Sequence, residues 1–205
     1  MKKIQVFFLI MIMFFLTSCK KTKKPYVPDD CNQIFPVEFV DFIQGRPLYI
    51  TSLGQSIDIE MLVTRLNFYG ITNYVIEYVL DFEETQVEDN AVIFLVVGAS
   101  IKGLGDSDRT IEGEIQRIEE LRQYKLSKNL SYVTFHLGGI YRRGETSDSL
   151  IKEAFLIADL AIYLEDGNFD GYLCRLGKEN NIPYVGCATY RELDNALLSL
   201  YNLQP

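Results

Sequence analysis

The chain has 205 residues and a formal net charge of −8 at pH 7, with 28 acidic and 20 basic side chains. This length fits a short leader and one domain of ordinary size. We expect no nucleic-acid partner, because the chain is acidic and has no stripe of clustered lysine and arginine side chains to bind phosphates.

Residues 1–18 have the pattern of a lipoprotein signal peptide. Lys2 and Lys3 precede an apolar run, residues 4–16, that is short for a membrane span. The sequence Leu-Thr-Ser-Cys that ends at Cys19 resembles the bacterial lipobox, which implies cleavage before Cys19 and acylation of that cysteine by palmitate-like chains. We therefore expect a membrane anchor at Cys19 and a location in the cell envelope, outside the cytoplasm. An ordinary secretory signal is the alternative.

Residues 19–30 contain four lysines and two prolines and predict a flexible tether. The remaining residues, 31–205, predict a single α/β domain with its core at 47–201. Three cysteines lie in this domain: Cys31, Cys174 and Cys187. A Cys174–Cys187 bridge is permitted after export, but we expect at least two of the three to be buried free thiols. No cysteine or histidine pair suggests zinc, and no cofactor is indicated.

From residue 47 onward, strands and helices alternate along the chain. Strands are expected at 48–52, 74–80, 91–97, 132–137, 159–164 and 183–186. Between them, helical spacing of apolar residues predicts helices over 59–69, around 111–121, over 149–158 and 172–180, and from 190 to about 201.

This alternation predicts a three-layer Rossmann-like, or flavodoxin-like, sandwich around a mainly parallel sheet of five to six strands. The expected strand order is 2-1-3-4-5, with a sixth strand outside the fifth. The order 3-2-1-4-5-6 is the alternative. Residues 31–45 precede this core and are expected to pack at an edge or as a cover.

The strand at 91–97 is apolar on both faces, as expected for a buried central strand, and it leads into a loop with Gly98, Gly103, Gly105 and Lys102. The loop has neither the Walker nor the dinucleotide-binding glycine spacing. Its backbone N–H groups, with Lys102, can bind an anion, or its glycines can simply form a tight turn. The arginine pair at 142–143 on a neighbouring loop favours an anion site.

In a parallel sheet, the loops that leave the strands' carboxyl ends meet at one edge, where ligands usually bind. Candidate ligand-binding residues collect on these loops: Ser52, Gln55, Ser56, Ser100, Lys102, Gly103, Gly105, Gly138, Gly139, Arg142, Arg143 and Ser147.

Two residues at this edge are candidates for acid–base catalysis. His136 is the only histidine and ends the fourth expected strand, and Asp148 follows on its exit loop. A histidine that only hydrogen-bonds a neighbouring loop is the more common arrangement. No nucleophile elbow of a hydrolase is present.

Asp166, Asn168 and Asp170 match the first half of a calcium-binding loop. Gly177 stands at the twelfth position, where a bidentate glutamate belongs, so a calcium ion would need another ligand. A turn capped by these side chains is the stronger interpretation.

Four segments, ITSLGQSIDIEM, LVVGASIKGLG, HLGGIYRRGETSD and LEDGNFDG, resemble a bacterial family, domain of unknown function 6305. The resemblance covers roughly residues 47–201 and implies an exported or anchored Rossmann-like domain, without a known activity or catalytic residue. We therefore expect an anchored protein that binds a small anionic molecule. The alternatives are an enzyme that uses His136 or Asp148, and an envelope interaction domain without a small ligand.

Overall fold

A computed structural model describes residue 31 and residues 34–80 and 85–204. The expected signal peptide, tether and acylated Cys19 lie outside these described residues. Within them, no helix is long and apolar enough to cross a membrane.

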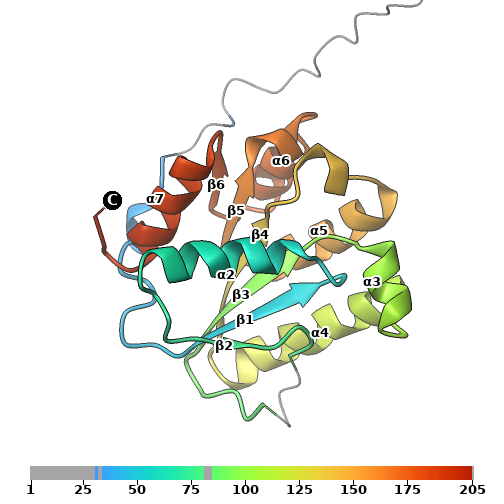
Figure 1. Cartoon of the computed structure of the whole chain (residues 1–205), viewed down its shortest axis with the longest axis horizontal. Coiled ribbons are helices and arrows are strands. Elements are labelled where there is room, and N and C mark those ends of the chain that lie inside the picture. The colour runs from blue at the N-terminus through green and yellow to red at the C-terminus, as the bar shows by residue number, and fades with distance from the viewer. Residues whose placement is uncertain (1–30, 32–33, 81–84, 205) are drawn as a thin grey trace, which may run out of the picture.

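A six-stranded parallel sheet forms the centre of the domain, with the order β2-β1-β3-β4-β5-β6 (Figure 1). The predicted order, including the sixth strand outside the fifth, is confirmed. The strands are β1 (Leu48–Leu53), β2 (Val75–Ile76), β3 (Val92–Val97), β4 (Ser131–His136), β5 (Leu160–Leu164) and β6 (Tyr184–Cys187).

Helices cover both faces of the sheet, as the alternating pattern predicts (Figure 1). On one face, α2 (Asp58–Phe68) and α7 (Tyr190–Leu200) pack on the sheet. On the other face lie α4 (Ile111–Ser127), α5 (Glu145–Ile157) and α6 (Tyr172–Glu179).

The central strand β3 contributes to both layers of the core. All six of its residues are buried, and they alternate between the two faces of the sheet. Val92, Phe94 and Val96 join the cluster under α2 and α7, whereas the residues between them join the cluster under α4 to α6. The prediction of a fully buried central strand is therefore confirmed.

The structure corrects three predicted elements. The strand expected at 74–80 is reduced to the two-residue β2, whose side chains are exposed. The glycine-rich loop after β3 contains a short helix, α3 (Ile101–Asp106), because the Ser100 hydroxyl accepts a hydrogen bond from Gly103 N and caps it. The helix expected to begin at residue 149 begins at Glu145, so the exit loop of β4 is shorter and includes the 3-10 turn η3 (Ile140–Arg142).

The segment before the sheet covers the end of α7. Asp41 N and Ile43 N donate to Ser199 O and Leu200 O. Phe39, from the 3-10 turn η2 (Val37–Phe39), and Ile43 are buried against the α2–α7 face. This agrees with the expectation that residues 31–45 form a cover.

A disulfide joins Cys31 to Cys174 in α6, across 143 residues of sequence. Cys187 is a buried free thiol. The expectation of at least two free thiols among the three is therefore wrong, and so is a Cys174–Cys187 bridge. The covering segment places Cys31 beside α6, whereas Cys187 lies at the end of β6, on the opposite face.

Candidate functional site

The carboxyl ends of β1 and β3 form the topological switch point of the sheet. From β1 the chain crosses to β2 on one side, and from β3 it crosses to β4 on the other. The loops therefore diverge and leave a crevice, which is the usual ligand position in this architecture. A groove of about 460 Å³ lies there, which we call the switch-point groove. Its lining is Gln55, Ser56, Ile57, Glu60, Tyr78, Ser100, Lys102, Gly103, Asp106 and Arg142.

Two cations face the switch-point groove from different loops. Lys102 extends from α3, and Arg142 comes from the exit loop of β4. Neither side chain makes a hydrogen bond or ion pair with a described residue, so both remain able to bind a ligand. Gly138 explains the position of Arg142, because a Cβ at Gly138 would overlap the arginine stem and lie 2.6 Å from Asp58 Oδ2.

Gln55 has the most unusual backbone in the groove. Its φ is 57°, a left-handed conformation that long side chains rarely adopt. Its amide nitrogen Nε2 is buried and has no hydrogen-bond partner among the described residues. Gly103 lies close, since a Cβ there would stand 3.0 Å from Gln55 Cβ. A strained residue with an unused donor is a common mark of a ligand site.

A buried ion network under the sheet holds the exit loop of β1 in place. Glu114 of α4 is fully buried, and its carboxylate accepts hydrogen bonds from Gly54 N at 2.8 Å and from Arg109 Nη1 at 2.9 Å. Arg117 forms an ion pair with Glu114 at 3.1 Å and donates to Ser52 O. Burial lowers the pKa of Arg117 to about 10, so it stays charged at neutral pH. The network fixes the backbone immediately before Gln55.

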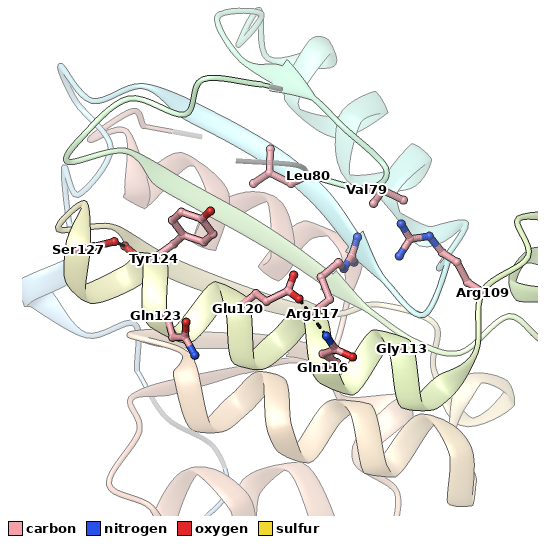
Figure 2. Close-up of a pocket in the computed structure, with 10 residues that line it drawn as sticks. All are labelled: Val79, Leu80, Arg109, Gly113, Gln116, Arg117, Glu120, Gln123, Tyr124 and Ser127. Carbon is pink, nitrogen blue, oxygen red and sulfur yellow. Dashed lines mark hydrogen bonds between the residues drawn. The ribbon is translucent and has the colours of Figure 1, made fainter. Parts of the chain in front are cut away.

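A larger groove of about 830 Å³ runs beside this network. Figure 2 shows Val79 and Leu80 on one side of it and the α4 side chains Arg117 and Tyr124 on the other. It lies along the side of α4 rather than over the strand ends, and none of the twelve candidate ligand-binding residues lines it. Arg117 is already committed to Glu114 and to backbone carbonyls.

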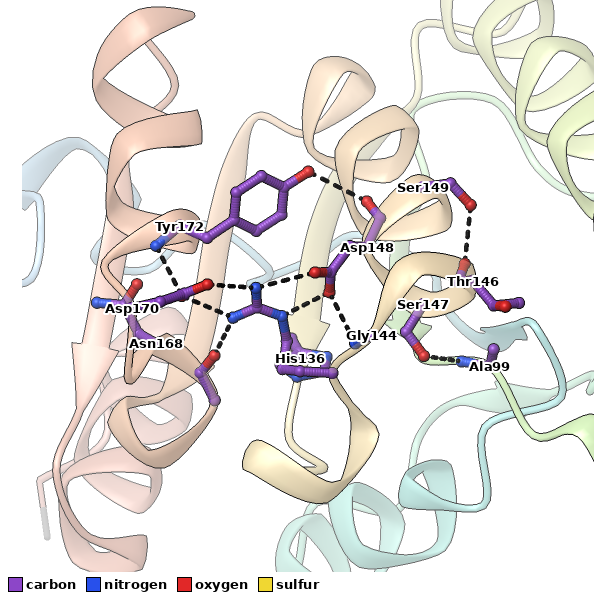
Figure 3. Close-up of polar contacts among 12 residues, drawn as sticks. Ala99, His136, Gly144, Thr146, Ser147, Asp148, Ser149, Asn168, Asp170 and Tyr172 are labelled. Carbon is purple, nitrogen blue, oxygen red and sulfur yellow. Dashed lines mark hydrogen bonds and ion pairs between the residues drawn. The ribbon is translucent and has the colours of Figure 1, made fainter. Parts of the chain in front are cut away.

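Arg143, next to Arg142 in sequence, has a different environment. Its guanidinium bonds Asp148 on one side at 2.6 Å and Asp170 on the other at 3.2 Å, and it also donates to Gly167 O (Figure 3). The ring of Tyr172 lies 4.8 Å from the guanidinium carbon. Burial alone would lower the pKa of Arg143, but the two carboxylates outweigh it and raise the pKa. We call this set the Arg143 cluster.

His136 lies under the Arg143 cluster and is fully buried. Its Nδ1 lies 3.1 Å from Val97 O, so the ring donates from Nδ1 and keeps its lone pair on Nε2. Nε2 is buried without a partner among the described residues, close to Gly167. Burial lowers the pKa of His136, with Arg143 adding to the effect, so the ring is neutral at physiological pH.

Comparison with protein families identifies the domain. The family described as Domain of unknown function (DUF6305) matches residues 45–201. The chain belongs to this family. No curated protein matches the chain, and no solved structure does either.

The remaining candidate residues of this DUF6305 domain lie outside the switch-point groove. Ser52 donates to Tyr78 O, and the Ser147 hydroxyl accepts from Ala99 N, so both stabilise the loops from within. Gly105 is exposed on α3, with nothing near the position of a Cβ. Gly138 and Gly139 line a second groove, over the ends of β4 to β6. Six of the twelve candidates are thus brought together: Gln55, Ser56, Ser100, Lys102, Gly103 and Arg142.

The residues of the half calcium pattern have separate partners. Asn168 Oδ1 accepts from Cys174 N inside α6, Asp170 pairs with Arg143, and Asp166 accepts from Ile140 N. Among the residues that the structure describes, no group of three or more histidine, cysteine, aspartate or glutamate side chains is placed to hold a metal ion.

Three residues of the DUF6305 domain were missed from the sequence. Asp58 Oδ2 accepts from Ser56 Oγ at 2.9 Å and lies between the ends of β3 and β4. Its signal was an acid in the first helical turn after a strand. Glu114 and Arg117 had no such signal, because α4 carries several similar charges and only the three-dimensional contacts show which of them are buried.

Proposed function

We propose that this DUF6305 domain is an anchored extracytoplasmic binding protein for a small polar molecule that carries an anionic group. The observation that carries the proposal is the switch-point groove, which gathers Lys102 from α3, Gln55 from the exit loop of β1 and Arg142 from the exit loop of β4. It occupies the position at which open parallel sheets usually bind ligands.

The charges of the groove describe the ligand more closely. Lys102 and Arg142 provide charge-assisted donors for a carboxylate or phosphate. Gln55 adds an amide donor that has no partner within the described part of the chain. Glu60 and Asp106 line the same groove, so its formal charges balance. The ligand therefore needs hydrogen-bond donors as well as its anionic group, as in a hydroxy acid or a sugar phosphate.

Binding is favoured over catalysis by the positions of the acid–base candidates. His136 is neutral and enclosed, and Asp148 is occupied by Arg143. Neither lines the switch-point groove. The open groove also favours binding of a small ligand over a function in protein–protein contacts alone.

Export and anchoring at Cys19 remain part of the proposal, and the Cys31–Cys174 disulfide supports them, since such bonds persist in oxidising compartments. Cys19→Ser should abolish labelling of the protein by an alkyne fatty acid and release it from the membrane fraction. Unchanged labelling would overturn the anchor, whatever the fate of the binding proposal.

The binding proposal is tested by thermal shift and titration calorimetry with phosphate, citrate and glucose 6-phosphate. We expect at least one of them to raise the unfolding midpoint. Lys102→Ala and Arg142→Ala should each weaken its binding about tenfold, the loss expected for one charged contact of about 1.4 kcal/mol. Lys152→Ala, an exposed change on α5, is the matched control and should bind as the wild type does. If none of the three anions binds, or if all variants bind alike, the proposal fails.

A further inference from the structure

A second groove lies over the carboxyl ends of β4, β5 and β6, with a volume of about 330 Å³. Leu137 and Leu164, at the ends of β4 and β5, form part of its lining. The exit loop of β4 separates it from the switch-point groove, because Tyr141 lines the second groove and its neighbour Arg142 lines the first. The two grooves therefore have different walls and can be tested separately.

Two tyrosines give the second groove its aromatic character. Tyr141 on the β4 exit loop is 94% exposed, which is unusual for a tyrosine without a bound partner. Tyr190 at the start of α7 is 50% exposed. Arg65 stacks 4.3 Å from the centre of the Tyr190 ring and is itself held by Asp194 at 2.6 Å. Arg65 thus covers one face of the Tyr190 ring and holds the ring in place, whereas the Tyr141 ring is open to solvent.

The charge in this groove has one sign. Asp166 is the only charged side chain among its described lining residues. Its Oδ2 accepts one long hydrogen bond, from Ile140 N at 3.3 Å, and it forms no ion pair with a described residue. Asp148, Asp170 and Asp194, by contrast, are each paired with an arginine. The described lining of this groove therefore combines an unpaired carboxylate with two tyrosines and contains no lysine or arginine.

The glycines of the β4 exit loop build this arrangement. Gly139 has a φ of 61°, and a Cβ there would lie 2.5 Å from Asp166 Oδ2. Only glycine lets the loop turn here and approach the carboxylate closely. The backbone thus places Asp166 beside the loop that carries Tyr141.

We propose that the second groove binds an alkylammonium group, that is, a positively charged amine with aliphatic substituents. Tyrosine rings attract such a cation through their negative faces, and a carboxylate adds direct charge complementarity. The leucines at the strand ends suit its aliphatic part. A neutral sugar ring could bond the tyrosine hydroxyls, but it would leave the charge of Asp166 without a counter-charge. The net charge of −8 on the whole chain also draws cations toward the surface.

The test measures the binding of choline chloride to the full-length protein by titration calorimetry at 150 mM salt. Saturable binding is expected, weakened about tenfold by Tyr141→Ala and by Asp166→Asn. Both changes should preserve the fold, since Tyr141 is exposed and an asparagine amide oxygen can still accept from Ile140 N. Circular dichroism and the unfolding midpoint verify this.

Two controls separate this site from general charge attraction and from the switch-point groove. Asp106→Asn removes a comparable carboxylate from the switch-point groove, and Lys102→Ala removes one of the two cations there. Both should leave choline binding unchanged, so failure of one groove is distinguishable from failure of the other. The proposal is overturned if choline does not bind, if all variants bind it alike, or if methyl glucoside binds more tightly than choline and responds to the same two changes.

Discussion

Two regions share the carboxyl edge of the sheet and differ in how their polar groups are used. In the Arg143 cluster, beside α5 and α6, the guanidinium is bonded to two carboxylates and a carbonyl, and the Cys31–Cys174 disulfide lies in the same helix layer. In the switch-point groove, Lys102, Arg142 and the Gln55 amide nitrogen have no hydrogen-bond or ion-pair partner among the residues that the structure describes. A region that satisfies its own polar groups stabilises the fold, whereas a region that leaves them unused is suited to binding. Substitutions in the Arg143 cluster should therefore lower the stability of the fold, whereas substitutions in the switch-point groove should lower the affinity for a ligand.

The largest effect on stability is expected from the Cys31–Cys174 disulfide, in the same helix layer as the Arg143 cluster. Replacing Cys31 and Cys174 together by serine frees a loop of 143 residues in the unfolded chain. The chain-entropy relation predicts a loss of about 4 to 5 kcal/mol in the free energy of unfolding. Urea titration with and without dithiothreitol measures it. Reductant should destabilise the wild type and Cys187→Ala but not the double serine variant, and an equal response of all three would refute the assignment.

Arg142 and Arg143 give the sharpest test of the comparison, because they are neighbours in sequence. Arg143→Met leaves Asp148 and Asp170 without their counterion and should cost about 2 to 3 kcal/mol. This is below the usual range for a buried pair, since both carboxylates are about one third exposed and partly screened. Arg142→Met should cost under about 0.5 kcal/mol but weaken anion binding.

Both arginine variants should be measured by chemical unfolding and by ligand titration. The comparison holds only if stability is lost in one and affinity in the other. Equal losses of stability would mean that Arg142 is also a structural residue, and only Lys102 would remain as a binding cation of the switch-point groove.

These two arginines also show why the site was only partly predictable from sequence. Both stand on the same polar loop after β4, and nothing in the sequence identifies which one is paired. The decision depends on Asp170, which follows a different strand and reaches Arg143 only in the folded sheet. The disulfide was unpredictable for the same reason, because Cys31 reaches Cys174 of α6 only in the folded domain.

The fold was more accessible because its signals are local. The apolar run of β3 and the helical spacing of apolar residues in α2 and α7 show directly which side chains are buried. This pattern of burial places each segment in the sheet or in a helical layer. Local signals failed where two of them conflict. In α3, Gly103 and Gly105 oppose a helix, but the Ser100 cap favours it and prevails. In the segment around β2, an apolar run indicated a longer strand, but the edge position leaves Val75 and Ile76 exposed.

His136, which lies under the Arg143 cluster, should make the free energy of unfolding depend on pH. Its folded-state pKa lies below the ordinary value of 6.5 because the ring is buried. As the pH falls below about 6.5, the unfolded chain binds a proton that the folded chain does not, so the free energy of unfolding decreases. The slope should approach about 1.4 kcal/mol per pH unit until the folded-state pKa is reached.

This slope is measured by urea unfolding between pH 7 and pH 5. His136→Asn keeps a donor for Val97 O but cannot titrate, so its slope in this interval should be smaller by that amount. Asp170 does not obscure the result, because its pKa is lowered from 3.8 and its contribution to stability is lost only at more acidic pH. Parallel pH dependences for the two proteins would show that His136 is not held neutral.

The smallest effect is expected from two glycines of α3 that occupy different positions relative to the groove. Gly105 has open space where a Cβ would be, so Gly105→Ala should stabilise the exposed helix by about 0.5 kcal/mol and leave anion binding unchanged. A Cβ at Gly103 would lie 3.0 Å from Gln55 Cβ and 3.1 Å from Ser100 Oγ. Gly103→Ala must therefore displace the left-handed Gln55 or weaken the cap of α3. Thermal unfolding and anion titration of both variants distinguish the two positions: loss of affinity in Gly103→Ala alone would place the contact of Gly103 with Gln55 and Ser100 in the binding site, whereas unchanged affinity in both would remove that contact from it.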